Sequence, residues 1–124
     1  MKSASHVMTR TLHTIAPDAC VADASRKMQQ NRIHSLIVDR CDGVDAYGII
    51  TDTDIVQKVL AHDRNPAAVA VREVMSKPII TIPPDTTLYE IAQLMARHKI
   101  NHLPVFDGTA LVGMVSSTDI FNVK

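Results

Sequence analysis

The apolar positions of this chain follow two periodicities, one typical of helices and one typical of strands, which alternate along the sequence. The clearest helical stretch has apolar side chains at i, i+3, i+4 and i+7, which predicts an amphipathic helix. These apolar positions are Leu88, Ile91, Ala92 and Met95. Thr87 and Glu90 have the spacing of a capping box at the start of this face, so we expect the helix to begin there.

A stretch nearer the N-terminus repeats this apolar face with Val21, Ala24 and Met28. Cys20 and Asp23 occupy its capping positions. A cysteine is not among the residues that cap a helix well. We therefore expect this helix to lack the capping box and to fray more readily.

Short runs rich in β-branched residues separate the helices and predict strands. Two of these runs, at 11–16 and 79–83, are followed by or end in proline. The other four are expected at 35–39, 47–51, 102–106 and 111–116. Asp-Gly pairs at 42–43 and 107–108 lie within the two connections, which predicts two hairpins.

A last helix is expected after each hairpin, one from Asp52 and a shorter one from Ser117. One face of the first has the apolar residues Ile55, Val56, Val59 and Leu60. A second apolar edge, more than a small core needs, comprises Val56, Val59, Ile120 and Phe121. We therefore expect a homodimer, since two-fold pairing is the commonest closed symmetry.

The two halves of the chain repeat each other. Residues 7–18, VMTRTLHTIAPD, align without a gap on residues 74–85, VMSKPIITIPPD, at an offset of 67 that later falls to 65. We assign copy one to residues 1–62, a linker to 63–71 and copy two to 72–124. Each copy alone is near the size at which a core becomes marginal. The copies are therefore expected to pack together as one pseudo-two-fold module.

The composition is that of an ordinary globular domain and argues against several kinds of partner. The 13 Lys and Arg residues balance the 13 Asp and Glu residues, and aromatic residues make up 3% of the chain. No nucleic-acid partner is expected, because such proteins carry a basic surplus or aromatic platforms. No signal-peptide core or run of ~20 apolar residues occurs, so we expect a cytoplasmic protein with no membrane partner. Cys20 and Cys41 have no C-x-x-C spacing and are expected to remain thiols.

Each copy closes on the same pattern, GIITDTDI in copy one and GMVSSTDI in copy two. A strand ends at Thr51 or Ser116, and a helix opens there with unpaired backbone N–H groups, which attract anions. The carboxylates of Asp54 and Asp119 are suited to accept hydrogen bonds from two vicinal ribose hydroxyls. Helix capping alone is the alternative role for the same side chains.

The order strand, helix, strand, strand, helix, found twice, resembles a tandem pair of CBS domains, often called a Bateman module. The resemblance rests on V-M near the start of each copy, T-I-x-P-D before the first long helix, L-P-V at 103–105 and the closing motifs. It implies an α/β fold of the α+β type, with two pseudo-two-fold related β-α-β-β-α CBS repeats packed as one module. The chain departs from the family pattern at Ile37, which replaces the proline of L-P-V. It also departs at Thr53 and Thr118, where the family often has a basic residue.

The resemblance further implies a non-catalytic regulatory module that binds an adenine nucleotide or adenosyl compound, of the AMP, ADP, ATP or S-adenosylmethionine class. The ligand would lie in two clefts between the repeats. By this resemblance one cleft takes Thr51, Asp54, Ile80, Ile100 and Asn101. The other takes Ser116, Asp119, His13, Ile33, His34 and His102. Ile49 and Met114, in the closing motifs, complete the candidate ligand-binding residues.

An enzyme is not expected, because the sequence has no Ser/His/Asp constellation, paired-acid motif or phosphate-binding G-x-x-x-x-G-K-[ST] loop. The nucleotide would be a regulatory ligand, and neither a cofactor nor a metal site is expected. Two alternatives stay open. The histidines of the second cleft could instead coordinate zinc with Asp119. The chain could also be a structural dimerisation or interaction module with no nucleotide ligand. In the leading hypothesis an effector protein, of unknown identity, receives the signal.

Overall fold

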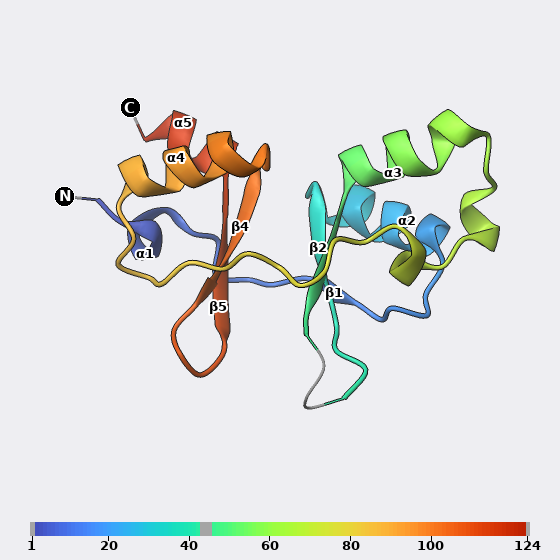
Figure 1. Cartoon of the computed structure of the whole chain (residues 1–124), viewed down its shortest axis with the longest axis horizontal. Coiled ribbons are helices and arrows are strands. Elements are labelled where there is room, and N and C mark those ends of the chain that lie inside the picture. The colour runs from blue at the N-terminus through green and yellow to red at the C-terminus, as the bar shows by residue number, and fades with distance from the viewer. Residues whose placement is uncertain (1, 43–45, 124) are drawn as a thin grey trace. The chain divides into compact units, whose positions relative to one another are not determined.

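The computed structural model describes residues 2–42 and 46–123, which fall into two compact units. One unit comprises His13–Ile79 and is called the middle unit. The other combines Met1–Leu12 with Ile80–Lys124 and is called the composite unit. Figure 1 shows the two units and the chain that runs between them. The sheet of the middle unit comes from copy one and that of the composite unit from copy two, so the start of copy one packs with copy two.

The middle unit is a three-stranded sheet with its helices on one side (Figure 1). Its strands are β1 (Thr14–Ile15), β2 (Ser35–Val38) and β3 (Gly48–Thr51). β1 pairs in parallel with β2, which pairs antiparallel with β3. Its helices are α2 (Val21–Asn31), α3 (Asp52–Lys58) and the short 3-10 helices η1 (Leu60–His62), η2 (Pro66–Ala68) and η3 (Val71–Glu73).

The composite unit is built on an antiparallel hairpin, again with its helices on one side (Figure 1). The hairpin strands are β4 (His102–Phe106) and β5 (Leu111–Ser116). The helices are α1 (Ala4–Val7), α4 (Leu88–His98) and α5 (Ser117–Asn122). The mixture of helix and strand in both units confirms the predicted fold class.

The strand predictions are confirmed for the two hairpins and only partly for the earlier runs. β4 and β5 have the expected bounds, and β2 and β3 are one residue shorter than expected. The run at 11–16 forms only the two-residue β1, and the run at 79–83 contributes a single parallel bridge from Ile82 to Val105. In β4, Pro104 stands where β2 has Ile37, so the bond that Ile37 N–H donates to the carbonyl of His13 has no counterpart at Ile80.

The helix starts follow the predicted capping chemistry. Thr87 Oγ1 accepts a hydrogen bond from Glu90 N–H at 3.2 Å, and Glu90 Oε1 accepts from Thr87 N–H at 3.1 Å, so the expected capping box is confirmed. That backbone bond holds the pKa of Glu90 below its usual value. Cys20 makes no side-chain capping bond at the start of α2, as the sequence indicated.

The second hairpin turns at Asp107 and Gly108, where the sequence placed an Asp-Gly turn. Asp107 Oδ1 accepts hydrogen bonds from the N–H groups of Thr109 and Ala110 at 2.8 and 2.9 Å. These bonds lower the pKa of Asp107. Gly108 has φ of +100°, a conformation that favours glycine. The other predicted turn, at 42–43, extends outside the described residues.

Each copy begins with a V-M segment, Val7-Met8 in copy one and Val74-Met75 in copy two. Each V-M segment packs on the sheet of the other copy. Thr9 and Met114 exchange two backbone hydrogen bonds, both of 2.9 Å, at β5. Ser76 and Ile49 make the same exchange, both bonds again of 2.9 Å, at β3. The bond pattern is equivalent in the two units, so the repeat in the sequence is also a repeat in how these segments dock.

Each unit has its own hydrophobic core. In the middle unit the largest fully buried side chains of the core are Val21, Leu36, Val38, Ile50, Val59 and Val71. In the composite unit they are Ile91, Leu103, Val105 and Val115. The segment 63–71, which the sequence predicts to be a linker, contributes two buried side chains, Val69 and Val71, to the core of the middle unit.

The apolar face predicted for the helix from Asp52 is divided between core and surface. Ile55 and Val59 are buried, whereas Val56 is 55% exposed and Leu60 is 53% exposed. The prediction that Val59 belongs to a spare apolar edge is wrong. The helix turns this side chain into the core of its own unit, so only Val56 and Leu60 remain for a partner.

Two further sequence predictions concern cysteines and membranes. Neither Cys20 nor Cys41 forms a disulfide, as expected. Across residues 2–42 and 46–123, every helix is too short or too polar to pass through a bilayer.

Candidate functional site

Each closing motif places a hydroxyl and a carboxylate side by side, and we call these two arrangements the Thr51 pair and the Ser116 pair. Thr51 Oγ1 accepts from Asp54 N–H at 3.1 Å, and Asp54 Oδ2 accepts from Thr51 N–H at 2.9 Å. In copy two the matching distances between Ser116 and Asp119 are 3.2 and 2.8 Å. Both pairs are therefore capping boxes, and the capping role considered from the sequence is observed. Capping uses one oxygen of each carboxylate, Oδ2.

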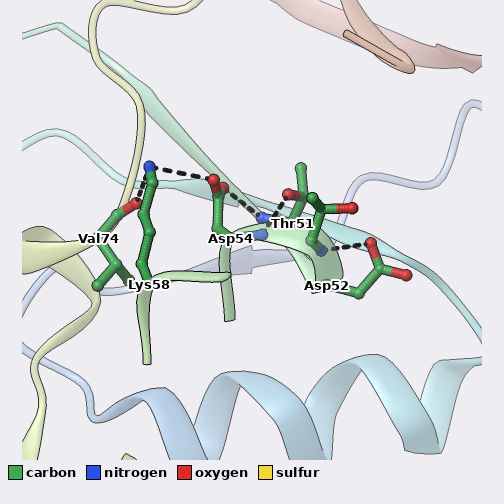
Figure 2. A network of polar contacts seen from close by, with 6 residues as sticks. Thr51, Asp52, Asp54, Lys58 and Val74 are labelled. Carbon is green, nitrogen blue, oxygen red and sulfur yellow. Dashed lines mark hydrogen bonds and ion pairs between the residues drawn. The ribbon is translucent and has the colours of Figure 1, made fainter. Parts of the chain in front are cut away.

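The other oxygen of Asp54 is occupied by Lys58, as Figure 2 shows. Asp54 Oδ1 lies 3.1 Å from Lys58 Nζ, and the same ammonium donates to the carbonyl of Val74 at 2.9 Å. Residues four apart lie on one face of a helix, which explains how Lys58 reaches Asp54. The side chain of Asp54 is 15% exposed, so this ion pair is better shielded from solvent than a surface pair.

The backbone N–H groups in the first turn of α3 are all paired. Asp52 N–H donates to the carbonyl of His34 at 3.0 Å, and Thr53 N–H donates to Asp52 Oδ1 at 2.8 Å. The third, Asp54 N–H, is the one bonded to Thr51 Oγ1. The prediction of unpaired N–H groups that attract an anion is therefore wrong for α3. The reason is that Asp52 folds its side chain back on its own helix, where its other oxygen lies 3.0 Å from His34 Nδ1.

The first turn of α5 in copy two is less fully paired. Ser117 N–H donates to the carbonyl of Asn101 at 2.9 Å, as its counterpart does in copy one. A serine, Ser117, replaces Asp52, and within residues 2–42 and 46–123 no hydrogen bond is found for the N–H of Thr118. The first turn of α5 therefore keeps one backbone donor that the first turn of α3 does not.

The carboxylate of Asp119 also differs from that of Asp54. The position that corresponds to Lys58 at the offset of 65 is Val123, which has no charge. In the part of the chain that the structure describes, no hydrogen bond or ion pair reaches Asp119 Oδ1. The two pairs thus share their capping geometry and differ in what occupies the second oxygen.

The remaining candidate residues are divided between the units. The middle unit contains His13, Ile33, His34 and Ile49, and the composite unit contains Ile80, Ile100, Asn101, His102 and Met114. Within the middle unit, His34 contacts Asp52, and the carbonyl of His13 accepts from the N–H of Ile37 at 3.0 Å. Within the composite unit, His102 pairs with Ser116 across the β4–β5 ladder. Each cleft predicted from the family resemblance combines residues of both units, so those combinations stay predictions.

Sequence reasoning missed Lys58 and Asp52 as members of the site. The spacing of Asp54 and Lys58 on a helix was a usable signal, because opposite charges four residues apart commonly pair. The bond from Lys58 to Val74 had no such signal, since these residues are 16 apart and meet only in the folded unit.

A metal site finds no support inside the described residues. Among residues 2–42 and 46–123, no three histidine, cysteine, aspartate or glutamate side chains gather closely enough to hold an ion.

Comparison with known proteins assigns the family. The CBS domain model matches residues 4–61 and 71–124, which together make up most of the chain. The CBS domain-containing protein YhcV of Bacillus subtilis is 33% identical over 120 residues, a match that covers 97% of this chain and 84% of YhcV. An uncharacterized protein of Methanopyrus kandleri is 32% identical over 123 residues, covering 98% of this chain and 62% of that protein.

A solved structure gives the same assignment. The hexameric CBS-CP12 protein from bloom-forming cyanobacteria superposes with a TM-score of 0.93 at 37% identity, covering 98% of this chain and 70% of that one. CBS tandem modules are generally regulatory and bind ligands, and the described residues include no separate catalytic domain. The chain therefore belongs to the CBS domain family, as a tandem pair of CBS domains.

Proposed function

We propose that this CBS pair is a non-catalytic sensing module that binds an adenine nucleotide or adenosyl compound and reports its presence to an effector protein. The observation that carries the proposal is the double occurrence of one hydroxyl–carboxylate arrangement, Thr51 with Asp54 and Ser116 with Asp119. A carboxylate oxygen beyond the one used for capping can accept hydrogen bonds from ribose hydroxyls. The closing motifs also match the family by their residues, which makes an adenosine-containing ligand the first to test.

The base would be held by apolar and backbone groups in this proposal. Ile49 and Met114 precede the two pairs on β3 and β5 and are half-buried. Ile80, Ile33 and Ile100 supply further apolar surface in the two units. Such side chains can contact an adenine ring without an aromatic partner, so the low aromatic content is no objection. In this proposal the protein binds the nucleotide without transforming it. The nucleotide is therefore a regulatory ligand and not a cofactor.

Ligand binding is expected to raise the melting temperature of the purified protein. AMP, ADP, ATP and S-adenosylmethionine would each be added up to millimolar concentration in a thermal-shift titration, with inorganic phosphate as the control compound. A ligand present at a hundredfold excess over its Kd stabilises the folded state by about 2.7 kcal/mol. That corresponds to a rise of several degrees in Tm for a domain of this size. No shift with any of the four compounds would contradict the proposal.

The same titration tests the alternative, a structural or interaction module with no nucleotide ligand. One observation favours this alternative. The N–H groups in the first turn of α3 are already hydrogen-bonded, and Lys58 already pairs with the carboxylate of Asp54. These groups of copy one therefore need no ligand to be paired. An interaction module would show no nucleotide shift and would still self-associate.

We further propose that the chain forms a homodimer through its exposed apolar helix residues. Val56 on α3 is 55% exposed and Phe121 on α5 is 75% exposed, and the two occupy matching positions of the repeats. A groove of about 380 Å³ between α2 and α3 continues the apolar surface beside Val56, with Met28, Ile33, Ile55 and Leu60 in its lining. The similar CBS-CP12 protein is hexameric, which supports self-association of this fold.

Sedimentation velocity checks this assembly. The protein at micromolar concentration is expected to sediment as a dimer, and Phe121→Ser is expected to raise the dimer Kd by about tenfold or more, as loss of a buried aromatic anchor does. Tyr89→Ser is the matched control, because Tyr89 is an equally exposed aromatic residue on α4, at 72%. A monomeric protein, or equal effects of the two substitutions, would refute the proposed surface.

A further inference from the structure

Helix α4 and the segment that precedes it line an open pocket in the composite unit. Its volume is about 480 Å³, within the range of about 300 to 1,000 Å³ that small-molecule pockets have. The charged residues of its lining are Asp85, Glu90 and Arg97, and Thr81 lies in the same lining. None of these four residues belongs to the candidate nucleotide site.

Copy one shows which groups bind at the equivalent positions of the repeat. There the ammonium group of Lys27, a half-buried side chain on α2, donates to the carbonyl of Thr14. The guanidinium group of Arg72 pairs with the carboxylate of Asp18. Both acceptors of copy one therefore hold a cation that the chain itself supplies.

Copy two retains these two acceptors and lacks the two cations. At the offset of 67, the acceptors correspond to Thr81 and Asp85, whereas the cations correspond to the neutral Leu94 and Ser5. The backbone confirms that Ser5 occupies the place of Arg72, since both N–H groups donate to the proline carbonyl of the T-I-x-P-D motif. In the part of the chain that the structure describes, no hydrogen bond or ion pair reaches the carbonyl of Thr81 or the carboxylate of Asp85.

A third ion pair of copy one is lost in copy two in the same way. Arg26 pairs with Asp23 at 2.6 Å, and copy two has the neutral Gln93 and the acidic Glu90 at these positions. Glu90 uses its Oε1 oxygen to cap α4, and among the described residues its other oxygen has no partner. Copy two thus presents three acceptors whose counterparts in copy one each bind a cation.

Arg97 adds a group of the opposite charge to the pocket. Glu90 and Arg97 are seven residues apart on α4, which corresponds to about 10 Å along the helix axis. Copy one has the neutral Gln30 in place of Arg97. Arg97 makes no hydrogen bond or ion pair with the residues that the structure describes. The pocket therefore combines acceptors for cationic groups with a binding group for one anion.

We propose that this pocket binds a basic amino acid of the lysine type, as a ligand separate from the nucleotide. The α-ammonium group donates to the carbonyl of Thr81, as Lys27 does at the equivalent carbonyl in copy one, and the α-carboxylate pairs with Arg97. The side-chain ammonium lies at the carboxylates of Asp85 and Glu90. Each of these contacts is charge-assisted, and the order of charges in the ligand matches their order along α4.

Titration of the isotope-labelled full chain with L-lysine, followed by NMR, tests the proposal. We expect the amide signals of residues 81–97 to shift in a saturable way at millimolar lysine. Norleucine has the same length but no side-chain ammonium, and cadaverine has both ammonium groups but no carboxylate. Each is expected to bind about 10-fold or more weakly than lysine, the loss typical for one hydrogen bond to a charged group.

These compounds need no substitution in the protein, so the comparison is free of folding effects. Norleucine that binds as tightly as lysine would overturn the role of Asp85 and Glu90. Cadaverine that binds as tightly as lysine would overturn the role of Arg97 and the amino-acid class of the ligand. The absence of any saturable shift with lysine would overturn the site.

Substitutions at exposed residues locate the ligand in copy two. Asp85→Asn and Arg97→Gln are each expected to weaken lysine binding about 10-fold, because each removes one charged partner of the ligand. Asp18→Asn makes the matched change in copy one, where the carboxylate is already paired with Arg72, and is expected to leave lysine binding unchanged. Equal effects of Asp85→Asn and Asp18→Asn would overturn the assignment to this pocket.

Supplying copy two with the cations of copy one is expected to close the pocket. Leu94→Lys combined with Ser5→Arg should weaken lysine binding about 10-fold or more, while Leu94→Met, which keeps the side chain apolar and similar in volume, should not. Unchanged lysine affinity in the doubly substituted protein would overturn the comparison with copy one. AMP binding, measured on the same variants, is expected to stay as in the unaltered protein. A parallel loss of AMP and lysine binding would contradict a separate site.

Discussion

Replacing Gly113 with alanine is expected to lower the free energy of unfolding of the composite unit by about 1 to 3 kcal/mol, the usual cost of overpacking. A Cβ at this position would lie 2.5 Å from Met8 Sδ and 3.1 Å from the carbonyl oxygen of Thr9. The sulfur can move, since it lies near the end of a flexible side chain. The carbonyl cannot move as easily, because Thr9 is bonded through its backbone to Met114 on β5.

The middle unit has the same arrangement and should respond in the same way. A Cβ at Gly48 would lie 2.8 Å from Met75 Sδ and 3.1 Å from the carbonyl oxygen of Ser76. Because Gly48 and Gly113 have no side chain, a V-M segment can approach each sheet closely. This contact links two motifs that are far apart in the sequence and that recur together in both copies.

A double-mutant cycle in chemical denaturation measures the contact. Gly113→Ala combined with Met8→Ala is expected to cost less than the sum of the single substitutions, by about 0.5 to 3 kcal/mol. Gly108→Ala is the control, because a Cβ there has no atom within 4 Å and so has nothing to couple with Met8. Strict additivity of Gly113→Ala and Met8→Ala would show that the close approach does not limit this position.

The sequence predicts the regular elements well because their signals are local. The bounds of β4 and β5 follow from alternation and a turn dipeptide, and the start of α4 follows from Thr87 and Glu90 three residues apart. These features depend only on residues that are neighbours in the chain. The run at 79–83 falls short of a strand because Pro104, on the facing β4, has no N–H to donate to it.

The docking of the V-M segments could not be predicted from the repeat. Val7 and Met8 are identical to their counterparts Val74 and Met75, so either segment fits either sheet by its sequence. Only the folded chain shows that Met8 lies against Gly113 of copy two and that Met75 lies against Gly48 of copy one. An internal repeat thus reveals equivalent contacts but leaves open which copy supplies each partner.

The candidate site shows the same limit. The closing motifs correctly placed Thr51, Asp54, Ser116 and Asp119 at two helix starts, because capping is a local interaction. The occupancy of Asp54 by Lys58 depends on a side chain one turn further on and on the carbonyl of Val74. The two copies therefore differ in what contacts the second oxygen of their carboxylates. This difference is seen in the folded units and cannot be read from the shared motif.

Removing residues 1–12 is expected to unfold the composite unit while the middle unit stays folded. Ala4 is fully buried in the composite core, and Val7 and Met8 pack against that core. The segment also forms backbone bonds from Ala4 N–H to Thr86 and from Ser5 N–H to Pro84, both of 2.9 Å. Lost burial and hydrogen bonds together amount to on the order of 5 kcal/mol, which is comparable to the whole stability of a small domain.

Hydrogen exchange measured by mass spectrometry separates the two units in this experiment. In the truncated chain, the amides of β5 are expected to lose their protection, while those of β2 and β3 keep it. A synthetic peptide of residues 1–12, added in excess, should restore protection of β5, because it supplies the missing partner of Met114 and Gly113. The same peptide with Ala4→Glu and Met8→Glu is the control and should not restore it, since neither charge can be buried without a partner. Full protection of β5 in the truncated chain would show that copy two folds without the segment that copy one provides.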